Sequence, residues 1–465
     1  MKNIIRRFYV LLLIGLFLVS PAARAQTVQN QATGDLPNPY EIFGKYVKQN
    51  NYITPLFELK AMEDKYLASP IWKEPYLESM ILLEGWVGNY DQAYAYENKL
   101  YETSRVYKQI KNSLKNEIPD TGKSPLADYK MLDPLDAIET VAASRQVIMI
   151  NEEHHTPFHR AITLQLLKRL YTKGFRYFAV EALYRDVSRI GTKEDTELNK
   201  RGFPMHKTGY YTDDPVFADA VRTALKLGYK VVPYDEVAIC EPGVDRNTCN
   251  ERRERGQAQT INDRILKDDP QAKILVHVGR AHNSKLVLAD NSKFMASYFR
   301  EITKIEPFTI DQLHFSERLN TANEQPLYRY LTRNNLLQNP SVYQKTDGSF
   351  FNQTAEGNDM VIFHPRMRYE NGRATFLKMN GLRKAEKINL KKLKLKANKS
   401  LFGGNEPILI QAFYSQESED AVPIDQIILY PNKEIPVLML PAGNFRILAM
   451  DKGGDVTRQY VKRIG

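Results

Sequence analysis

Five short polar clusters in the middle of the chain hold residue types that do acid–base or metal chemistry. Each cluster ends or follows an apolar run of strand length. The clusters are Asn151-Glu152-Glu153-His154-His155, Glu181, Asp235-Glu236, Gly279-Arg280-Ala281-His282 and Asp311. Carboxylates and imidazoles are common general bases and common ligands of divalent metals. The sequence therefore offers one candidate site, made from residues that lie far apart in the chain.

Apolar runs and amphipathic helical patterns alternate around these clusters. Strands are predicted at 147–150, 175–180, 230–234, 274–278 and 308–310. Helices are predicted from Pro157 to a stop at Gly174, and at 216–227, 252–266 and 293–303. This alternation predicts an α/β fold with a mainly parallel sheet flanked by helices. Because the carboxyl ends of parallel strands meet at one edge of the sheet, we expect the five clusters to converge there.

We predict that Glu152, His154, His155, Glu181 and His282 form the catalytic group. In one scheme His154, His282 and a carboxylate, either Glu181 or Glu152, hold a divalent metal with an open position for water. In the other scheme there is no metal, and His154 or His155 is the general base. Glu152 and Glu181 then orient the water, while His282 or the first helix N-terminus stabilises the developing anion. The residues alone leave both schemes open.

Further polar residues near the predicted rim are expected to bind substrate. The segment 184–212 is longer than an ordinary connection, and such loops are often functional, so we interpret it as a lid. Arg253 and Arg255, on the helix 252–266, face either an acidic group or solvent. The predicted substrate-binding residues are His159, Asp235, Arg255, His206 and Tyr210.

The first 25 residues have the pattern of a secretory signal peptide. Lys2, Arg6 and Arg7 precede the apolar run 10–19, and Ala23-Arg24-Ala25 is typical of a cleavage site. Export to the periplasm or the extracellular space is therefore expected, with a soluble mature chain. No later segment reaches the 18 or so apolar residues that a membrane span needs.

The composition argues against nucleic acid as a partner. The whole chain has a formal net charge of +10, and part of this charge lies in the predicted leader. The remaining charges are mixed in sign, and the most basic run, 383–399, alternates with leucine rather than with aromatic residues. A small molecule or a peptide is the expected substrate, and the oligomeric state stays open.

The two cysteines, Cys240 and Cys249, lie close together in an exported chain and are predicted to form a disulfide. Their spacing fits neither a redox motif nor a zinc site.

Changes of pattern along the chain predict its domain organisation. The segment 39–125 is expected to be helical, 130–318 to form the α/β core, and 319–375 to connect it to a β-sandwich-like domain at 376–465. The strand pattern at 360–363 is counted among the strands of this all-β region.

Three strings and one acidic residue in the α/β region resemble known motifs. Asn151 to His159 (Asn-Glu-Glu-His-His-Thr-Pro-Phe-His) is similar to the Gly-Glu-x-His-Asp-Asn-Pro-x-His stretch of ChaN-like haem-uptake proteins. Gly279-Arg280-Ala281-His282 resembles the second Gly-x-x-His of Tiki-type proteins, and 253–259 resembles the Arg-Asp-x-x-Met-Ala helix of erythromycin esterases. Glu181 takes the place of the acid that these proteins share. Residues 145–312 thus resemble the superfamily that joins erythromycin esterases, ChaN-like proteins and Tiki/TraB proteins.

The resemblance has departures that leave one choice open. Asn151 replaces the usual glycine of the first motif. The esterase register selects His155, whereas the ChaN and Tiki registers select His154.

The resemblance and the site together imply three functions. The first is an exported hydrolase that cleaves an ester, a lactone or an amide, with or without a divalent metal. The second is a binding protein for haem or iron, with His154, His282, Tyr210 or Tyr211 as a ligand. The third is a surface or interaction protein that has lost catalytic activity.

Overall fold

The computed structural model describes residues 36–103, 114, 117–118, 124–186, 193–235, 243–288, 290–352, 357–395, 406–431 and 433–465. The described chain forms two compact units. The first contains Tyr101–Lys200 and Thr223–Arg366, and the second contains the residues up to Leu100, Arg201–Arg222 and Met367–Gly465. The predicted signal peptide lies outside the described residues. Among the described residues, no helix is long and apolar enough to cross a membrane.

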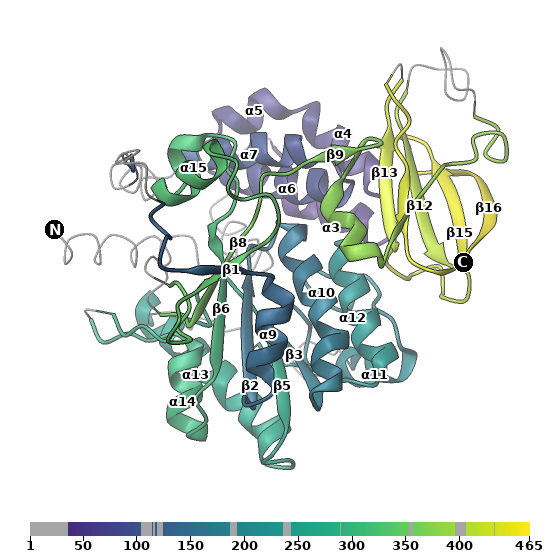
Figure 1. Ribbon diagram of the computed structural model, residues 1–465. Coiled ribbons are helices and arrows are strands. Elements are labelled where there is room, and N and C mark those ends of the chain that lie inside the picture. The colour runs from purple at the N-terminus through teal and green to yellow at the C-terminus, as the bar shows by residue number, and fades with distance from the viewer. Residues whose placement is uncertain are drawn as a thin grey trace. The chain divides into compact units, whose positions relative to one another are not determined.

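A six-stranded parallel sheet forms the centre of the first unit, as the sequence predicts (Figure 1). The strand order is β4-β3-β5-β2-β6-β8, so β5 inserts between β3 and β2 after the chain has reached the edge strand β4. The strands are β2 (Val147–Glu152), β3 (Phe175–Val180), β4 (Lys230–Pro233), β5 (Lys273–Gly279), β6 (Phe308–Phe315) and β8 (Met360–Phe363). A separate antiparallel pair joins β1 (Lys130–Leu132) to β7 (Val342–Gln344).

Helices cover both faces of this sheet. Helices α9 (Pro134–Ala142) and α10 (Pro157–Thr172) lie on one face. On the other, α13 (Arg246–Ile261), its π-helical continuation η2 (Asn262–Leu266) and α14 (Met295–Thr303) pack on alternate residues of β2, such as Val147 and Met149. The unit also contains α11 (Glu194–Arg201) up to Lys200, the end of α12 (Pro215–Leu227) from Thr223, η3 (Thr321–Asn323) and α15 (Pro326–Arg333).

Local signals explain where the flanking helices begin and end. Pro157 occupies the first turn of α10, where its missing N–H costs nothing. Gly174 and Gly228 follow α10 and α12 with φ angles of 89° and 92°, and this left-handed conformation is easiest for glycine. These two stops agree with the sequence prediction.

The strand at 360–363 differs from its prediction. It pairs in parallel with β6 as β8, so it is the sixth strand of the α/β sheet and not part of the C-terminal β region. A strand of four buried apolar residues looks the same in either setting, because the pattern does not specify its partner.

The second unit combines helices with an antiparallel sheet. The sheet has the order β13-β12-β15-β16, formed by β12 (Ile408–Tyr414), β13 (Asp425–Leu429), β15 (Gly443–Met450) and β16 (Val456–Ile464). The helices are α3 (Pro39–Val47), α4 (Ile53–Lys60), α5 (Glu63–Ala68), α6 (Lys73–Trp86) and α7 (Tyr90–Thr103). Smaller elements are the pairs β9 (Tyr369–Glu370) with β10 (Arg373–Ala374) and β11 (Lys384–Glu386) with β14 (Leu438–Leu440), and the 3-10 segment η4 (Thr375–Gly381).

One face of the antiparallel sheet shares a core with these helices. Leu409 and Phe413 of β12 pack in the same cluster as Leu56 and Trp86. Alternate residues such as Ile410 enter a second core that contains β14. The sheet is therefore buried on both faces, an arrangement that the sequence did not predict.

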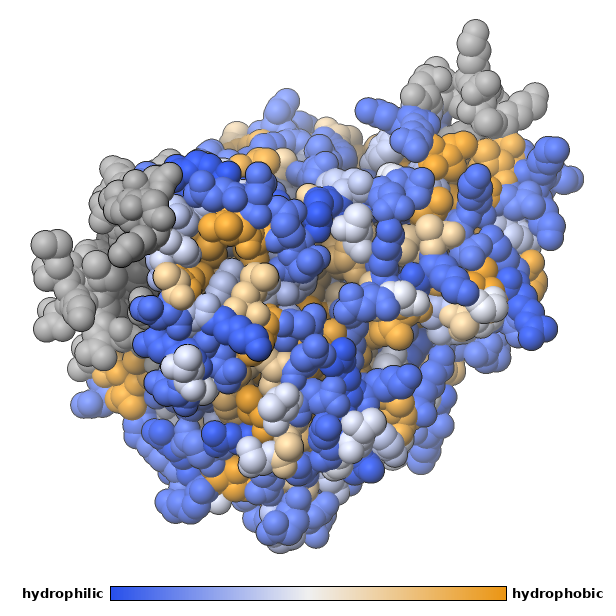
Figure 2. Space-filling view, viewed as in Figure 1, coloured by the Kyte–Doolittle hydropathy of each residue, from blue (hydrophilic) through white to orange (hydrophobic). Residues whose placement is uncertain are grey.

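The segment 201–222 also belongs to the second unit. Met205 pairs with Ala421, and two buried ion pairs join Arg222 to Glu417 at 2.7 Å and Asp219 to Arg383 at 2.6 Å. Hydrophilic residues cover most of the face in Figure 2, and apolar residues lie between them in small patches.

Candidate functional site

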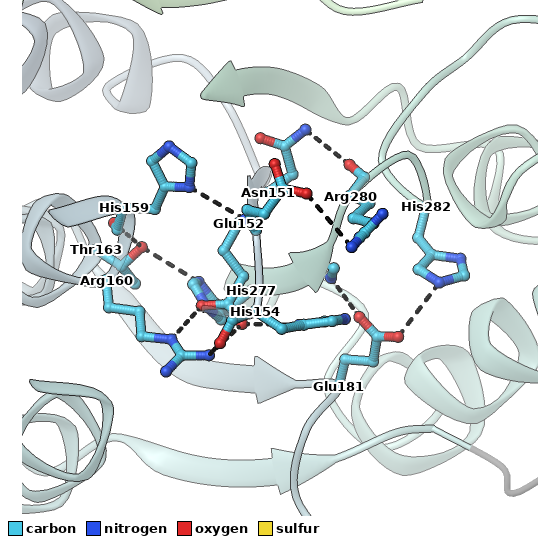
Figure 3. A network of polar contacts seen from close by, with 12 residues as sticks. Asn151, Glu152, His154, His159, Arg160, Thr163, Glu181, His277, Arg280 and His282 are labelled. Carbon is cyan, nitrogen blue, oxygen red and sulfur yellow. Dashed lines mark hydrogen bonds and ion pairs between the residues drawn. The ribbon is translucent and has the colours of Figure 1, made fainter. Parts of the chain in front are cut away.

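Strands β2, β3 and β5 end side by side and bring four of the five predicted catalytic residues together (Figure 3). Glu152 is the last residue of β2, Glu181 follows β3, and the turn after β5 carries His282. His154 follows β2 and points across the end of β5 toward Glu181. The convergence that the fold class predicted is therefore present.

Glu152 is the centre of a buried hydrogen-bond network. Its Oε1 accepts from Arg160 Nη2 at 2.9 Å and from His154 Nδ1 at 3.0 Å. Its Oε2 accepts from Arg160 Nε at 2.5 Å and from His277 Nε2 at 3.0 Å. A carboxylate has about four acceptor sites, so protein donors use all of them. Glu152 is thus arranged to orient its neighbours rather than to accept a proton or a metal.

The charge of Glu152 is stabilised where it lies. Burial raises the pKa of this carboxyl, but the guanidinium of Arg160, with His277 and His154, lowers it further, so the net pKa lies well below its usual range. Glu152 is therefore ionised at neutral pH.

His154 is a partly exposed imidazole that Glu152 holds by one nitrogen. Its side chain is 23 % exposed, whereas that of Glu152 is 2 % exposed. Burial lowers the pKa of His154 more than Glu152 and Glu181 raise it, so the ring is neutral at neutral pH. Because the carboxylate only accepts, Nδ1 carries the proton and Nε2 carries the lone pair.

Gly279 lets His154 and Glu181 approach each other. A Cβ at Gly279 would stand 2.4 Å from His154 Cε1, 2.7 Å from His154 Nε2 and 2.8 Å from Glu181 Oε2. The basic nitrogen and the carboxylate oxygen therefore flank the same bare stretch of backbone. Any side chain at this position would push them apart.

Glu181 is the second ionised carboxylate of the site. Its Oε1 lies 2.8 Å from Arg253 Nη2 and 3.3 Å from His282 Nε2, and its Oε2 accepts from the Gly279 N–H. Burial raises the pKa of Glu181, but His282 and Arg253 outweigh it and hold the pKa below its ordinary value. Oε2 is the oxygen beside His154.

His282 lies between two carboxylates. Nε2 faces Glu181, and Nδ1 lies 2.6 Å from Glu254 Oε1, off the direction of a hydrogen bond, so this contact is an ion pair. Burial lowers the pKa of His282, but Glu254 and Glu181 raise it to about 10. Arg253 Nη1 also lies 3.4 Å from Nε2 and would pair best with a neutral ring. The imidazolium is favoured, because Glu181, Glu254 and Asp235 together outnumber the one arginine.

The turn after β5 has an unusual backbone conformation that hydrogen bonds stabilise. Arg280 has a φ of 44°, which is uncommon for a residue with a side chain. Its N–H donates to the Glu152 carbonyl at 2.8 Å, and its carbonyl accepts from Asn151 Nδ2 at 2.7 Å. Asn151, which stands where the resembling family has glycine, therefore ties β2 to this turn.

A second pair of charges lies beside the turn. Glu153 contacts Arg280 at 3.3 Å and Arg318 at 3.0 Å. Burial raises the pKa of Glu153, but Arg280 and Arg318 lower it more, so the carboxylate is ionised.

Asp311, at the fifth strand end, contacts His314 at 2.8 Å and also accepts from Asn151. His314 offsets the effect of burial and lowers the pKa of Asp311 to about 2.

Three predicted substrate-binding residues lie in the first unit. His159 is 1 % exposed, and its ring bonds the Glu153 N–H and the Ser316 hydroxyl. Asp235 accepts from Arg253 and from Gln257 Nε2. Arg255 is exposed and lies over the ring of Tyr298, so it is Arg253 that the helix presents to the site.

The other predicted residues lie elsewhere. His206 and Tyr210 belong to the second unit, where His206 bonds Asp213 and Asn50. His155 is half-buried, and its charge contributes to the low pKa of Glu153. Cys249 is buried, but Cys240 lies outside the described residues, so their disulfide stays a prediction.

The predicted metal ligands do not fit a divalent cation. Among the described residues, no group of three or more His, Cys, Asp or Glu side chains is arranged to hold a metal. Arg253 already brings a cation to within 2.8 Å of Glu181 and 3.4 Å of His282. The mechanism below therefore has no step through a metal.

Two residues of the network were missed by the sequence reasoning. Arg160 and Thr163 lie on the buried side of α10, in line with Leu167 and Leu170. A charged residue within an apolar helical stripe is a signal for a buried ion pair, and this signal was available. His277 was noticed only as part of a strand.

Comparisons with known proteins leave the family open. No family model matches the chain, and no curated protein matches it. Among solved structures, the type III effector HopBA1 is 13 % identical with a TM-score of 0.31, covering 52 % of this chain and 99 % of that one. RRSP, a MARTX toxin effector domain from Vibrio vulnificus CMCP6, is 12 % identical with a TM-score of 0.26, covering 55 % and 54 %. The C-terminal region of Pasteurella multocida toxin is 12 % identical with a TM-score of 0.31, covering 87 % and 58 %.

Likenesses of this size carry no argument about function. The resemblance to erythromycin esterases, ChaN-like and Tiki/TraB proteins stays a prediction.

Proposed function

We propose that this chain is a hydrolase in which His154 is the general base that activates water. One observation carries the proposal: a neutral, partly exposed imidazole is bonded at Nδ1 by the ionised Glu152 and directs Nε2 toward Glu181. An imidazole oriented by a buried carboxylate is a common general base, because the carboxylate also stabilises the imidazolium that forms.

The geometry supports a water between two acceptors. His154 Nε2 and Glu181 Oε2 flank Gly279, and a water there donates one hydrogen to each. His154 takes a proton as the water oxygen attacks a carbonyl carbon, and Glu152 stabilises the resulting imidazolium. Arg253, 19 % exposed beside Glu181, supplies positive charge for the developing oxyanion. His154 then returns its proton to the leaving alkoxide or amine as the carbon–oxygen or carbon–nitrogen bond breaks.

A matched pair of variants tests the proposal on a panel of chromogenic esters, lactones and peptide amides. We expect His154→Gln to lower kcat/KM about 10²- to 10⁴-fold, the usual contribution of a general base. His155→Gln should stay within about threefold of wild type, because His154 is the histidine that meets Glu152. Wild-type rates in His154→Gln, or no turnover of any panel member by the wild type, would contradict the proposal.

Metal removal is a second test. We expect dialysis against EDTA to leave the rate unchanged, because Arg253 stands next to the groups that a metal would need. Loss of activity that zinc or manganese restores would overturn the metal-free scheme. Haemin is expected to give no Soret band that depends on His154, and such a band would favour haem binding instead.

A further inference from the structure

Glu152 bonds two histidines, of which only one is exposed. His154 and His277 each lie 3.0 Å from the carboxylate, but their side chains are 23 % and 2 % exposed. His277 stands in the middle of the sheet on β5, where its carbonyl accepts from the Glu181 N–H and the Tyr234 hydroxyl. Water activation as proposed above uses His154 and gives His277 no part.

The partners of His277 hold both nitrogens of its ring. Glu152 only accepts, so His277 Nε2 carries a hydrogen and donates to the carboxylate. Nδ1 lies 3.2 Å from the hydroxyl of Thr163, which is fully buried. The carbonyl of His159 is 3.5 Å from the same hydroxyl, at the limit of a hydrogen bond, so His277 is its nearer partner.

A chain of hydrogen bonds therefore joins Thr163 to His277, His277 to Glu152 and, on the other carboxylate oxygen, Glu152 to His154 (Figure 3). Building on the proposed function, we infer that Thr163 and His277 are positioning residues that set how strongly Glu152 holds the ring of His154. Each donor to a carboxylate withdraws part of its negative charge and weakens its bonds to the other donors. The Thr163 hydroxyl, bonded to Nδ1, holds the His277 ring so that Nε2–H points at Glu152.

The balance at His154 is sensitive to this contact. Burial lowers the pKa of His154 while Glu152 raises it. A donor that withdraws negative charge from Glu152 therefore favours the neutral ring of His154. Without the N–H of His277, more of the carboxylate charge falls on His154 Nδ1–H. The ring is then protonated at a higher pH, and Nε2 loses the lone pair that takes the proton from water.

The test is an NMR titration of the histidine Cε1–H signals in the full mature chain. The chain has eight histidines, and His154→Gln assigns the signal of His154. We expect His277→Leu to raise the His154 pKa by about 0.5–1 unit and Thr163→Val to raise it by less, as for the loss of one hydrogen bond to a charged partner. His277→Gln, whose amide donates to Glu152, should restore part of the wild-type value. The acid limb of kcat/KM should move by the same amounts.

A control variant removes a hydroxyl from the same helix without touching the network. Thr172 donates to the Arg169 carbonyl of its own helix at 2.7 Å, so Thr172→Val should leave the His154 pKa unchanged.

The outcomes separate the inference from the function on which it builds. An unchanged His154 pKa in Thr163→Val and in folded His277→Leu overturns the positioning role, even if His154→Gln abolishes hydrolysis. Shifted pKa values in a protein that hydrolyses nothing support the positioning role and reject the proposed function. Thr163→Val is nearly isosteric, so it keeps the test open if His277→Leu fails to fold.

Discussion

Two histidine–carboxylate pairs, one in each unit, differ in what the second ring nitrogen of the histidine meets. His154 bonds Glu152 at 3.0 Å, and His206 bonds Asp213 at 2.5 Å. The second nitrogen of His206 meets Asn50 Oδ1 at 2.6 Å, whereas that of His154 lies over Gly279 beside Glu181.

The orientation of Asn50 fixes the partner of His206 Nε2. Asn50 Nδ2 donates to the carbonyls of Glu419 and Ala421, so its Oδ1 faces the histidine. His206 is 7 % exposed and joins three segments of the second unit. Both ring nitrogens of His206 thus meet buried side chains of the second unit, whereas the His154 side chain is 23 % exposed at the strand ends.

Replacing each of the two histidines with glutamine should give the largest effects on stability and on rate. His206→Gln removes a ring that bonds the buried side chains of Asp213 and Asn50, and it should cost about 1–3 kcal/mol of unfolding free energy. His154→Gln should cost less than about 1 kcal/mol but remove the hydrolytic rate. Chemical denaturation and kcat/KM are measured for both variants. If the two substitutions had equal effects on stability and on rate, the two histidines would not differ in role.

Gly279→Ala, which fills the space beside Gly279, should have the next largest effect on the rate. The Cβ of Gly279→Ala collides with His154 and Glu181, and a displacement of about 1 Å in a catalytic group costs on the order of 100-fold in rate. Gly44→Ala is the matched control, because a Cβ there meets no atom within 4 Å. Steady-state kinetics are measured for both variants. Full activity in Gly279→Ala would show that His154 and Glu181 do not act together.

Arg253 and Arg255 lie two positions apart on α13 and test where the site ends. Arg253 contacts Glu181 and Asp235, whereas Arg255 lies over Tyr298. We expect Arg253→Gln to lower kcat about tenfold through loss of oxyanion stabilisation, with Arg255→Gln within about twofold of wild type. A larger effect for Arg255 would place the substrate on the other side of the helix.

The pH dependence should show the smallest but most diagnostic effect. The base must be neutral, so activity is lost as pH falls through the lowered pKa of His154, and the acid limb should lie below 6.5. His282 has a pKa raised to about 10, so its imidazolium stabilises the fold fully below 6.5, and this stabilisation is lost as pH rises through about 10. A pH–rate profile and unfolding curves from pH 5 to 11 test both limbs, and an acid limb above 6.5 would contradict the assignment.

Much of the fold and the location of the site could be predicted from the sequence. Strands β2 to β6 and the convergence of Glu152, Glu181 and His282 follow from alternation and from the geometry of parallel sheets. The place of β8 could not be predicted, because four apolar residues do not specify their partner strand. The core that the helices share with Leu409 and Phe413 depends on contacts between segments more than 300 positions apart in the chain.

The roles within the site were harder to predict than its location. Glu152 carries the same side chain whether it binds a metal, accepts a proton or orients a histidine. Only the positions of Arg160 and His277, which fill its acceptor sites, distinguish these roles. The same holds for His206, whose sequence neighbourhood gave no sign of Asn50.

The most direct test of the central claim is the protonation state of His154, observed by ¹⁵N NMR of its ring at pH 7 in the wild-type chain. We predict a neutral ring with hydrogen on Nδ1 and a lone pair on Nε2. The position of this hydrogen should change in Glu152→Gln. A ring protonated on both nitrogens at pH 7, or a hydrogen on Nε2 alone, would contradict it.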